Sequence, residues 1–217
     1  MLKDELITVR EKFFSNAPNH VTNNVTQATN ELLDSGIATG LTEGDQAPDF
    51  TLKNANGKFI TLSEELKKGP VILNFYRGGW CPYCNLELRA YEEILNDIKA
   101  EGAQLIAISP QTPDQSLTTQ EKNNLSYEVL SDTSQEVIKN YNLLFEMPDY
   151  LIKTYRDDFN IDLSDFNSKE DPWRLPVAGT VVISQDGTIM TSSANVDYMY
   201  RAEPREVLMQ LKNKKRI

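Results

Sequence analysis

The sequence is poor in the residues that metal sites and nucleic-acid-binding surfaces require. Its 217 residues include two cysteines and a single histidine, His20. A structural zinc site usually takes four cysteine or histidine ligands, so these three fall short of that number. The chain also lacks a glycine-rich phosphate loop or a nucleotide fingerprint, and we expect neither a metal nor a cofactor. The net charge of −10 argues against nucleic acid as a partner.

Long hydrophobic runs are missing too. No apolar stretch approaches the roughly 20 residues of a membrane span, and residues 1–6 carry acidic groups in place of a secretory apolar core. We therefore expect no membrane partner and a cytoplasmic location. In a reducing compartment, a Cys-x-x-Cys spacing indicates a transient, catalytic disulfide rather than a structural one.

The two cysteines lie where a predicted strand passes into a predicted helix. Residues 71–76 form a short apolar run that is typical of a strand buried on both faces. Two glycines follow and permit a sharp turn. Residues 85–100 then repeat apolar side chains every three or four positions, which predicts a helix. Cys81 and Cys84 therefore lie at the beginning of this helix.

This placement favours redox chemistry at the two sulfurs. The thiolate is the nucleophile, whereas a free cysteine with a pKa of about 8.5 is mostly protonated at neutral pH. Unpaired N–H groups of a first helical turn carry roughly half a positive charge, which stabilises a thiolate. Pro82 suits the first helical position because it has no N–H to leave unpaired. We expect a dithiol–disulfide pair with at least one sulfur ionised near neutral pH.

The sequence leaves alternative interpretations open for the cysteines and for the residues around them. The cysteines could be inert core residues, as free cysteines often are. Arg77 could add a cation beside them or be a surface arginine. Trp80 could shield the sulfurs or pack on the sheet. Glu87, one turn beyond Cys84, could accept a proton, but a solvated helix face is favoured.

The rest of the chain predicts an α/β fold with a central mixed, mainly parallel sheet and helices on both faces. Residues 1–43 are predicted to form an N-terminal helical extension, and residues 44–217 the main domain. The predicted segments are helices at 2–15, 20–35, 134–145, 148–158 and 203–214, and hairpins at 49–62 and 179–191. Residues 162–176 are polar and irregular.

At three stretches the chain resembles a known family with the thioredoxin fold. They are residues 44–52, residues 75–84 with the run Trp80-Cys81-Pro82-Tyr83-Cys84, and residues 176–187. The resemblance is to the peroxiredoxin-like branch of the alkyl hydroperoxide reductase / thiol-specific antioxidant superfamily, and residues 197–204 are similar to that branch as well. It implies a thioredoxin-like domain that reduces hydroperoxides.

The chain departs from the family pattern around the cysteines. In peroxiredoxins the motif Pro-x-x-x-(Thr/Ser)-x-x-Cys ends on the cysteine that attacks peroxide. That cysteine corresponds to Cys84, while Cys81 takes the Thr/Ser position and Arg77 the Pro position. The family's later arginine falls near Ala178. Thioredoxins have a cis-proline near that point, where this chain has Gly179.

The resemblance therefore implies two alternative roles for the cysteines. In a peroxiredoxin, Cys84 attacks a hydroperoxide and Cys81 condenses with the resulting sulfenic acid. In a thioredoxin-like disulfide reductase, Cys81 attacks a substrate disulfide and Cys84 resolves the mixed disulfide. Either cycle needs a dithiol reductant, with thioredoxin or glutaredoxin as the expected partner. A redox-sensing binding module is a third alternative, and the resemblance also allows a homodimer.

Overall fold

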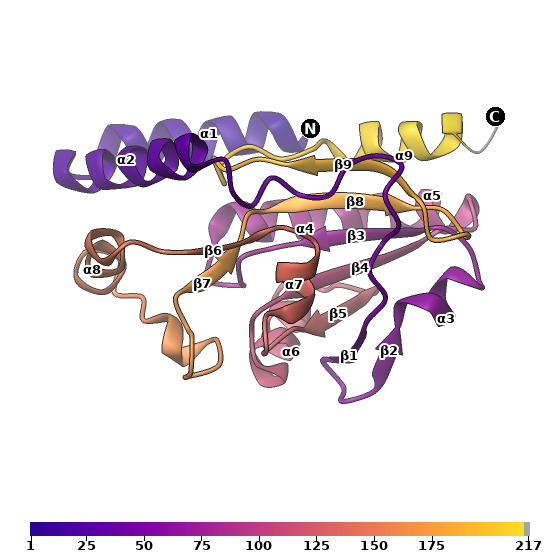
Figure 1. Ribbon diagram of the computed structural model, residues 1–217. Coiled ribbons are helices and arrows are strands. Elements are labelled where there is room, and N and C mark those ends of the chain that lie inside the picture. Colours follow the sequence, from indigo (N-terminus) through magenta and orange to yellow (C-terminus); the bar gives the residue numbers. More distant parts are fainter. Residues whose placement is uncertain (215–217) are drawn as a thin grey trace.

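A mixed sheet with helices on both faces forms the body of the protein (Figure 1). The computed structural model describes residues 1–214. Within them, seven strands hydrogen-bond in the order β2-β1-β5-β4-β3-β8-β9. They are β1 (Thr51–Asn54), β2 (Phe59–Thr61), β3 (Val71–Phe75), β4 (Gln104–Ser109), β5 (Glu128–Ser131), β8 (Gly179–Ile183) and β9 (Ile189–Ala194). The three central strands, β5, β4 and β3, are parallel, and the flanking strands pair antiparallel. The predicted α/β fold and both predicted hairpins are confirmed.

Helices cover the two faces of this sheet. They are α1 (Leu2–Asn16), α2 (Asn19–Ser35), α3 (Leu62–Leu66), α4 (Pro82–Glu93), α5 (Leu95–Ala100), α6 (Pro113–Lys122), α7 (Glu136–Asn140), α8 (Asp149–Asp157) and α9 (Pro204–Lys214), with a 3₁₀ turn at Leu163–Asp165. Side chains of α1, α4, α5, α8 and α9 share one apolar cluster, and those of α3 and α7 share the other.

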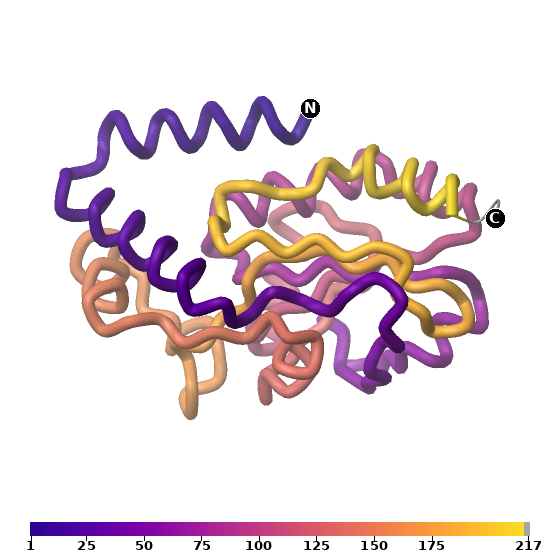
Figure 2. The backbone as a smooth tube through the Cα atoms, turned by 45° about the horizontal axis from the view of Figure 1, so that its top comes forward, coloured from indigo at the N-terminus to yellow at the C-terminus, as the bar shows by residue number. Residues whose placement is uncertain are grey.

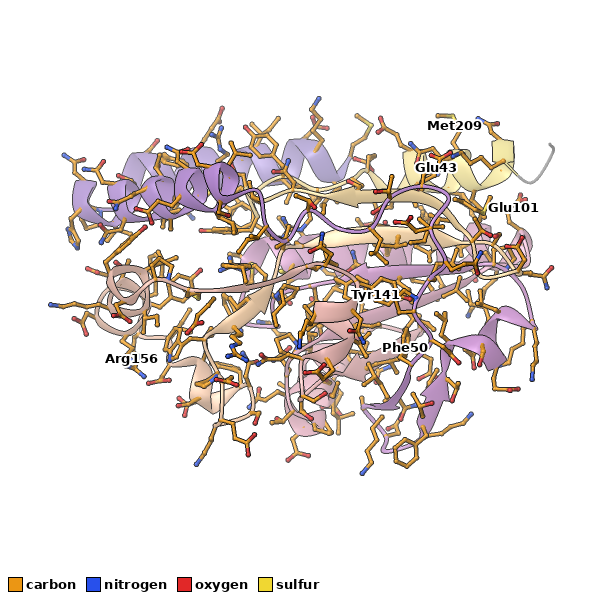
Figure 3. All side chains as sticks on the ribbon, viewed as in Figure 1. Glu43, Phe50, Glu101, Tyr141, Arg156 and Met209 are labelled. Atoms are coloured by element: carbon orange, nitrogen blue, oxygen red, sulfur yellow. The ribbon has the colours of Figure 1, made fainter. Side chains whose placement is uncertain are left out.

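Strand β3 lies between the two clusters and is buried along its whole length. Because successive strand residues point to opposite faces, Leu73 and Phe75 enter one cluster and Ile72 enters the other. Phe50 and Tyr141, both labelled in Figure 3, belong to the same cluster as Leu73 and Phe75. Their rings lie 6.4 Å apart, edge to face. This strand ends directly before the cysteine loop, so the loop starts from a rigid core element.

The two N-terminal helices pack on the same chain. Leu2 and Leu6 bury one face of α1 against α4, and Val21 and Val25 anchor α2, which lies along α8. Figure 2 shows the chain turning back between the two helices. The division into residues 1–43 and 44–217 stays a prediction, and residues 215–217 of it lie outside the described residues. Within the described chain, none of the helices is long and apolar enough to cross a membrane.

Two predicted helices differ in the structure. The single helix expected over residues 85–100 is two helices, α4 and α5, because the backbone of Ile94 leaves the helical conformation. The prediction of a helix over residues 134–145 was wrong beyond the end of α7 at Asn140. Asn142 adopts a positive φ of 53°, and the chain then forms β6 (Leu144–Glu146), which pairs with β7 (Arg174–Pro176) in a separate small sheet.

Candidate active site

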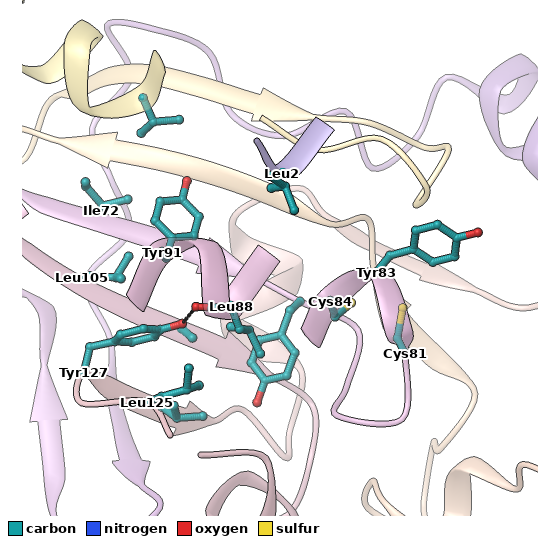
Figure 4. Packing of buried hydrophobic residues seen from close by; sticks show 14 of the residues in the cluster. Leu2, Ile72, Cys81, Tyr83, Cys84, Leu88, Tyr91, Leu105, Leu125 and Tyr127 are labelled. Atoms are coloured by element: carbon teal, nitrogen blue, oxygen red, sulfur yellow. Dashed lines mark hydrogen bonds between the residues drawn. The ribbon is translucent and has the colours of Figure 1, made fainter. Parts of the chain in front are cut away.

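Both cysteines lie at the N-terminal end of α4, as their spacing predicts (Figure 4). Cys81 is the N-cap residue, Pro82 occupies the first helical turn, and Cys84 follows within that turn. Both are free thiols, with exposed fractions of 1% for Cys81 and 0% for Cys84. Both sulfurs therefore lie beneath the protein surface, at the N-terminal end of α4, where the helix dipole is positive.

Gly78 is required by the shape of the loop that leads to the cysteines. Its φ of +155° is one that side-chain-bearing residues rarely adopt. A Cβ at this position would lie 2.2 Å from Nε1 of Trp80. The glycine therefore lets the indole fold back over the loop and lie against the active-site side chains.

The electrostatic environment makes the two sulfurs unequal. Burial would raise the pKa of the Cys84 thiol, but a hydrogen bond from Cys81, the charge of Arg201, and the backbone N–H and charge of Arg77 bring that pKa well below its usual value. Nη2 of Arg201 lies 3.5 Å from the Cys84 sulfur. Burial, and then the hydrogen bond and charge of Cys84, raise the pKa of Cys81. Both shifts favour the thiolate at Cys84 and the thiol at Cys81.

Arg201 is held in place by Glu87 and by the backbone of its own loop. Its Nε donates to Oε2 of Glu87 at 2.8 Å, and both side chains are 1% exposed. Its Nη1 donates to the carbonyl oxygens of Tyr198 and Tyr200. Burial and the nearby Cys84 raise the pKa of Glu87 to about 7, although Arg201 opposes this shift. The guanidinium is therefore fixed between a carboxylate and a thiolate.

Glu87 and Arg201 are the site residues that the sequence reasoning misjudged or missed. The solvated face predicted for Glu87 was wrong, because the residue lies three positions after Cys84 and four before buried Tyr91, on the inner stripe of α4. That spacing was the feature of the sequence that could have predicted the burial of Glu87. Arg201 reaches the site from the loop after β9, so only the family-like segment at residues 197–204 pointed to it. It supplies a cation beside Cys84, whereas the family's later arginine falls near Ala178.

Arg77 is buried, so the alternative of a surface arginine was wrong. Its side chain is 2% exposed, and its guanidinium lies 4.1 Å from the ring centroid of Tyr198 and 5.2 Å from that of Trp80. Nη2 donates to the hydroxyl of Tyr155 at 2.8 Å. Its Nε and Nη1 have no hydrogen-bond partner among residues 1–214. Two buried nitrogens of the Arg77 guanidinium thus keep their N–H groups unpartnered.

An apolar cavity of about 270 Å³ adjoins these groups. Cys81 lines it, and Cys84 does not. The other lining residues are mostly aromatic: Phe13, Arg77, Trp80, Pro82, Tyr83, Tyr155, Phe159, Ile161 and Tyr198. Trp80 therefore forms a wall next to Cys81 and touches Tyr155 edge to face rather than packing simply on the sheet. Helix α1 contributes to this cavity through Phe13.

The described residues contain no grouping of three or more His, Cys, Asp or Glu side chains that could hold a metal ion. His20 lies apart from the cysteines and contacts Asp158 at 2.8 Å on the surface.

Comparison with known proteins identifies the fold and the family. Residues 43–192 match the model of the AhpC/TSA family. The chain belongs to this family. A putative peroxiredoxin of Mycobacterium tuberculosis is 33% identical over 100 residues, which cover 46% of this chain and 63% of the relative. The thiol-disulfide oxidoreductase ResA of Halalkalibacterium halodurans is 34% identical over 103 residues, which cover 46% of this chain and 56% of the relative. The matches thus span about half to two thirds of these relatives' lengths.

The fold of this AhpC/TSA family member also matches solved structures. The crystal structure of peroxidoxin BcpB from Mycobacterium tuberculosis superimposes with a TM-score of 0.63 at 20% sequence identity, covering 80% of this chain and 97% of BcpB. This likeness shows the thioredoxin-like peroxiredoxin fold. The family match, residues 43–192, contains both cysteines and Arg77, whereas Phe13 and Arg201 lie outside it.

Proposed function

We propose that the protein is a thiol peroxidase in which Cys84 reduces hydroperoxides and Cys81 resolves the oxidised sulfur. The observation that carries this proposal is the asymmetry of the two sulfurs. Cys84 is the one whose pKa is lowered, with Nη2 of Arg201 at 3.5 Å, while the pKa of Cys81 is raised. Family membership supports the same assignment, because the resemblance implies that Cys84 corresponds to the peroxide-attacking cysteine.

In the first step the Cys84 thiolate attacks one oxygen of the hydroperoxide. A sulfur–oxygen bond forms, the O–O bond breaks, and the departing alkoxide or hydroxide takes a proton, giving a sulfenic acid and an alcohol or water. Negative charge moves from the sulfur to the departing oxygen during this step. The unpartnered N–H donors of Arg77 are placed to stabilise that charge, because fixed donors in a dry site need no reorganisation.

In the second step the sulfur of Cys81 attacks the sulfenic sulfur of Cys84. The disulfide forms and the oxygen leaves as water. Because the two cysteines are three positions apart at the start of α4 and each shifts the pKa of the other, we propose that this step needs no unfolding of α4. A thiol donor then returns the disulfide to the dithiol, and a thioredoxin- or glutaredoxin-type protein is the donor that the resemblance implies. The homodimer and the cytoplasmic location stay predictions.

A disulfide reductase is the second candidate function. Two observations favour it: Cys81, rather than Cys84, lines the cavity, and one of the relatives is a thiol-disulfide oxidoreductase. In this cycle Cys81 would be the attacking thiolate. The raised pKa of Cys81 opposes that role, because a buried, protonated thiol attacks a disulfide slowly.

The deciding experiment measures the consumption of hydrogen peroxide and cumene hydroperoxide with a thiol donor present, for the wild type, Cys84→Ser and Cys81→Ser. We expect wild-type turnover, no reaction for Cys84→Ser, and one oxidation event without recycling for Cys81→Ser. Insulin disulfide reduction is measured on the same three proteins.

If no variant consumes peroxide but the wild type reduces insulin in a Cys81-dependent way, the peroxidase assignment is wrong and the disulfide reductase is right. Slow thiol chemistry without turnover, together with a partner retained in one redox state, would favour a redox-sensing module instead.

A further inference from the structure

Glu87 is a buried ionisable group that the two steps of the proposed reaction do not use. It lies on the inner face of α4, three positions after Cys84. Its Oε2 accepts a hydrogen bond from Nε of Arg201 at 2.8 Å, whereas its Oε1 has no hydrogen-bond partner in the described chain. An ionised carboxylate would therefore leave charge on an unpartnered oxygen in the protein interior, where such charge is costly. A proton on Oε1 removes that cost and keeps the contact with Arg201.

Glu87 and Cys84 share one guanidinium. Nη2 of Arg201 lies 3.5 Å from the Cys84 sulfur, and Nε of the same side chain lies 2.8 Å from Oε2 of Glu87. If both acids were ionised, two negative charges would share the cation that contacts them in a dry site. Like charges that are this close raise each other's pKa, so the two groups titrate as a coupled pair.

Two other ionisable side chains interact with Glu87, and neither carries charge at neutral pH. Tyr91 lies four positions later on α4, and Tyr127 comes from the segment before β5. Burial, more than any other cause, raises the pKa of both phenols. The negative charge that changes beside Glu87 during the cycle is thus that of Cys84, which raises the pKa of Glu87 in the reduced protein.

Oxidation of the cysteines removes this charge. Arg77 and Arg201 stay protonated in both redox states, whereas the thiolate of Cys84 disappears when it forms a disulfide with Cys81. Loss of a negative charge next to a carboxyl group lowers the pKa of that group. A proton bound to Glu87 in the reduced protein would therefore be released on oxidation, and the total charge of the buried site would stay constant.

We propose that Glu87 is the redox-linked proton carrier of the cysteine pair: it holds a proton while Cys84 is a thiolate and gives that proton up when Cys84 and Cys81 form a disulfide. The inference rests on the dithiol–disulfide cycle of the proposed function. It gives Glu87 a part in the reaction beyond holding Arg201 in place.

The proton of Glu87 balances the oxidative half of the cycle. The Cys84 thiolate forms a bond with one peroxide oxygen, the O–O bond breaks, and the departing alkoxide or hydroxide takes up one proton. Cys81 then attacks the sulfenic sulfur, and its thiol proton leaves with the hydroxyl group as water. The cysteine pair supplies one proton fewer than these steps consume. Glu87 supplies the missing proton and ends as a carboxylate.

The reductive half of the cycle returns this proton. A dithiol donor brings two electrons and two protons and becomes a disulfide. One proton remains on Cys81, Cys84 leaves as a thiolate, and the second proton goes back to Glu87. Neither half of the cycle then needs a net proton from solvent, which suits sulfurs whose residues are 1% and 0% exposed.

The test is the equilibrium between dithiothreitol and the disulfide of the full-length protein, prepared with diamide. The thiols of dithiothreitol stay protonated near neutral pH, so it gives up two protons with its two electrons. If Cys81 and Glu87 take up one proton each, the equilibrium constant is independent of pH below about pH 7. Above that pH, Glu87 is ionised in both redox states, and the constant should rise about tenfold per pH unit.

Glu87→Gln cannot take up a proton, and Glu93→Gln, at an exposed position on the same helix, is its matched control. We expect Glu87→Gln to show the rise of about tenfold per pH unit below pH 7 as well, and Glu93→Gln to retain the wild-type profile. The profiles are compared where the ultraviolet absorbance of the thiolate is constant. A wild-type constant that rises tenfold per pH unit over this whole range, or equal profiles for the wild type and Glu87→Gln, would overturn the inference.

Infrared difference spectroscopy of the oxidised against the reduced wild type provides a measurement that needs no variant to fold. Below pH 7 the wild type should lose the carbonyl stretch of a protonated carboxylic acid on oxidation, and Glu87→Gln should not. Absence of this loss in the wild type, or its persistence in Glu87→Gln, would contradict the assignment. Neither measurement uses peroxide, so the outcome is independent of whether the protein proves to be a peroxidase.

Discussion

Replacing Arg201 by methionine should raise the pKa of Cys84 and slow its reactions at neutral pH. The guanidinium Nη2 lies 3.5 Å from the Cys84 sulfur, and both groups are buried. Coulomb's law at an effective dielectric constant of about 20 gives on the order of 5 kcal/mol at that separation, as an upper bound. Measured charged hydrogen bonds contribute roughly 1.5–3 kcal/mol. We therefore expect an increase of about 1–2 pKa units, at 1.36 kcal/mol per unit.

The assay is the rate of alkylation by iodoacetamide as a function of pH, with the ultraviolet absorbance of the thiolate as a second readout. The wild type should react well below the free-thiol value of about 8.5. Arg201→Met should lose up to about a hundredfold in rate at neutral pH and regain it at higher pH. Arg201→Lys keeps the charge, and Arg156→Met, the control, removes an arginine that is 50% exposed and pairs with Asp162.

An Arg201→Met profile that coincides with the wild type would refute the assignment of Arg201 as the cation that ionises Cys84. Glu87 partly offsets the expected rise in the Cys84 pKa, because it loses its own negative charge when Arg201 is removed. Its pKa is already raised to about 7, so it takes up a proton near neutral pH once its partner is removed. The folded state of each variant is checked by its thermal unfolding midpoint.

Two further outcomes follow from the same site. Glu87→Gln removes a negative charge near Cys84, so the Cys84 pKa should fall further, and any inflection near pH 7 in the peroxide-rate profile should vanish; an unchanged profile would separate Glu87 from the reaction. Gly78→Ala should displace Trp80, measured as a shift in indole fluorescence, because the new Cβ would lie 2.2 Å from Nε1. Gly44→Ala also replaces a glycine of positive φ, here +93°, but with open space around it, and a shift of equal size there would contradict the steric explanation.

The sequence was sufficient to predict the strand, loop and helix that carry the cysteines. A mainly apolar run, two glycines and a helical stripe each have one dominant local solution, and β3, the loop at Gly78 and α4 follow it. Pro82 at the start of the helix was predictable for the same reason. These features depend on neighbours along the chain, so periodicity and turn chemistry capture them.

The charged partners of Cys84 could not be found in that way. Arg201 contacts a residue more than a hundred positions earlier, and only the packing of the loop after β9 on α4 brings them together. Arg77 looked equally suited to a surface, because nothing in its local pattern records the rings of Tyr155 and Tyr198 that enclose it. The small sheet of β6 and β7 was missed because its pairing depends on two segments far apart in the chain.

The contribution of both ends of the chain to one site has a consequence for dissecting the protein. A fragment cut to the family-matched segment, residues 43–192, would retain both sulfurs and the turn that presents them. It would lack the cation at position 201 and the ring of Phe13, leaving the Glu87 carboxyl buried alone and the cavity open on one side. Fragments that contain only the cysteine motif should thus not reproduce the thiol acidity of the intact chain. Exchange of the terminal segments between relatives should alter both the thiol acidity and the ligand preference of the cavity.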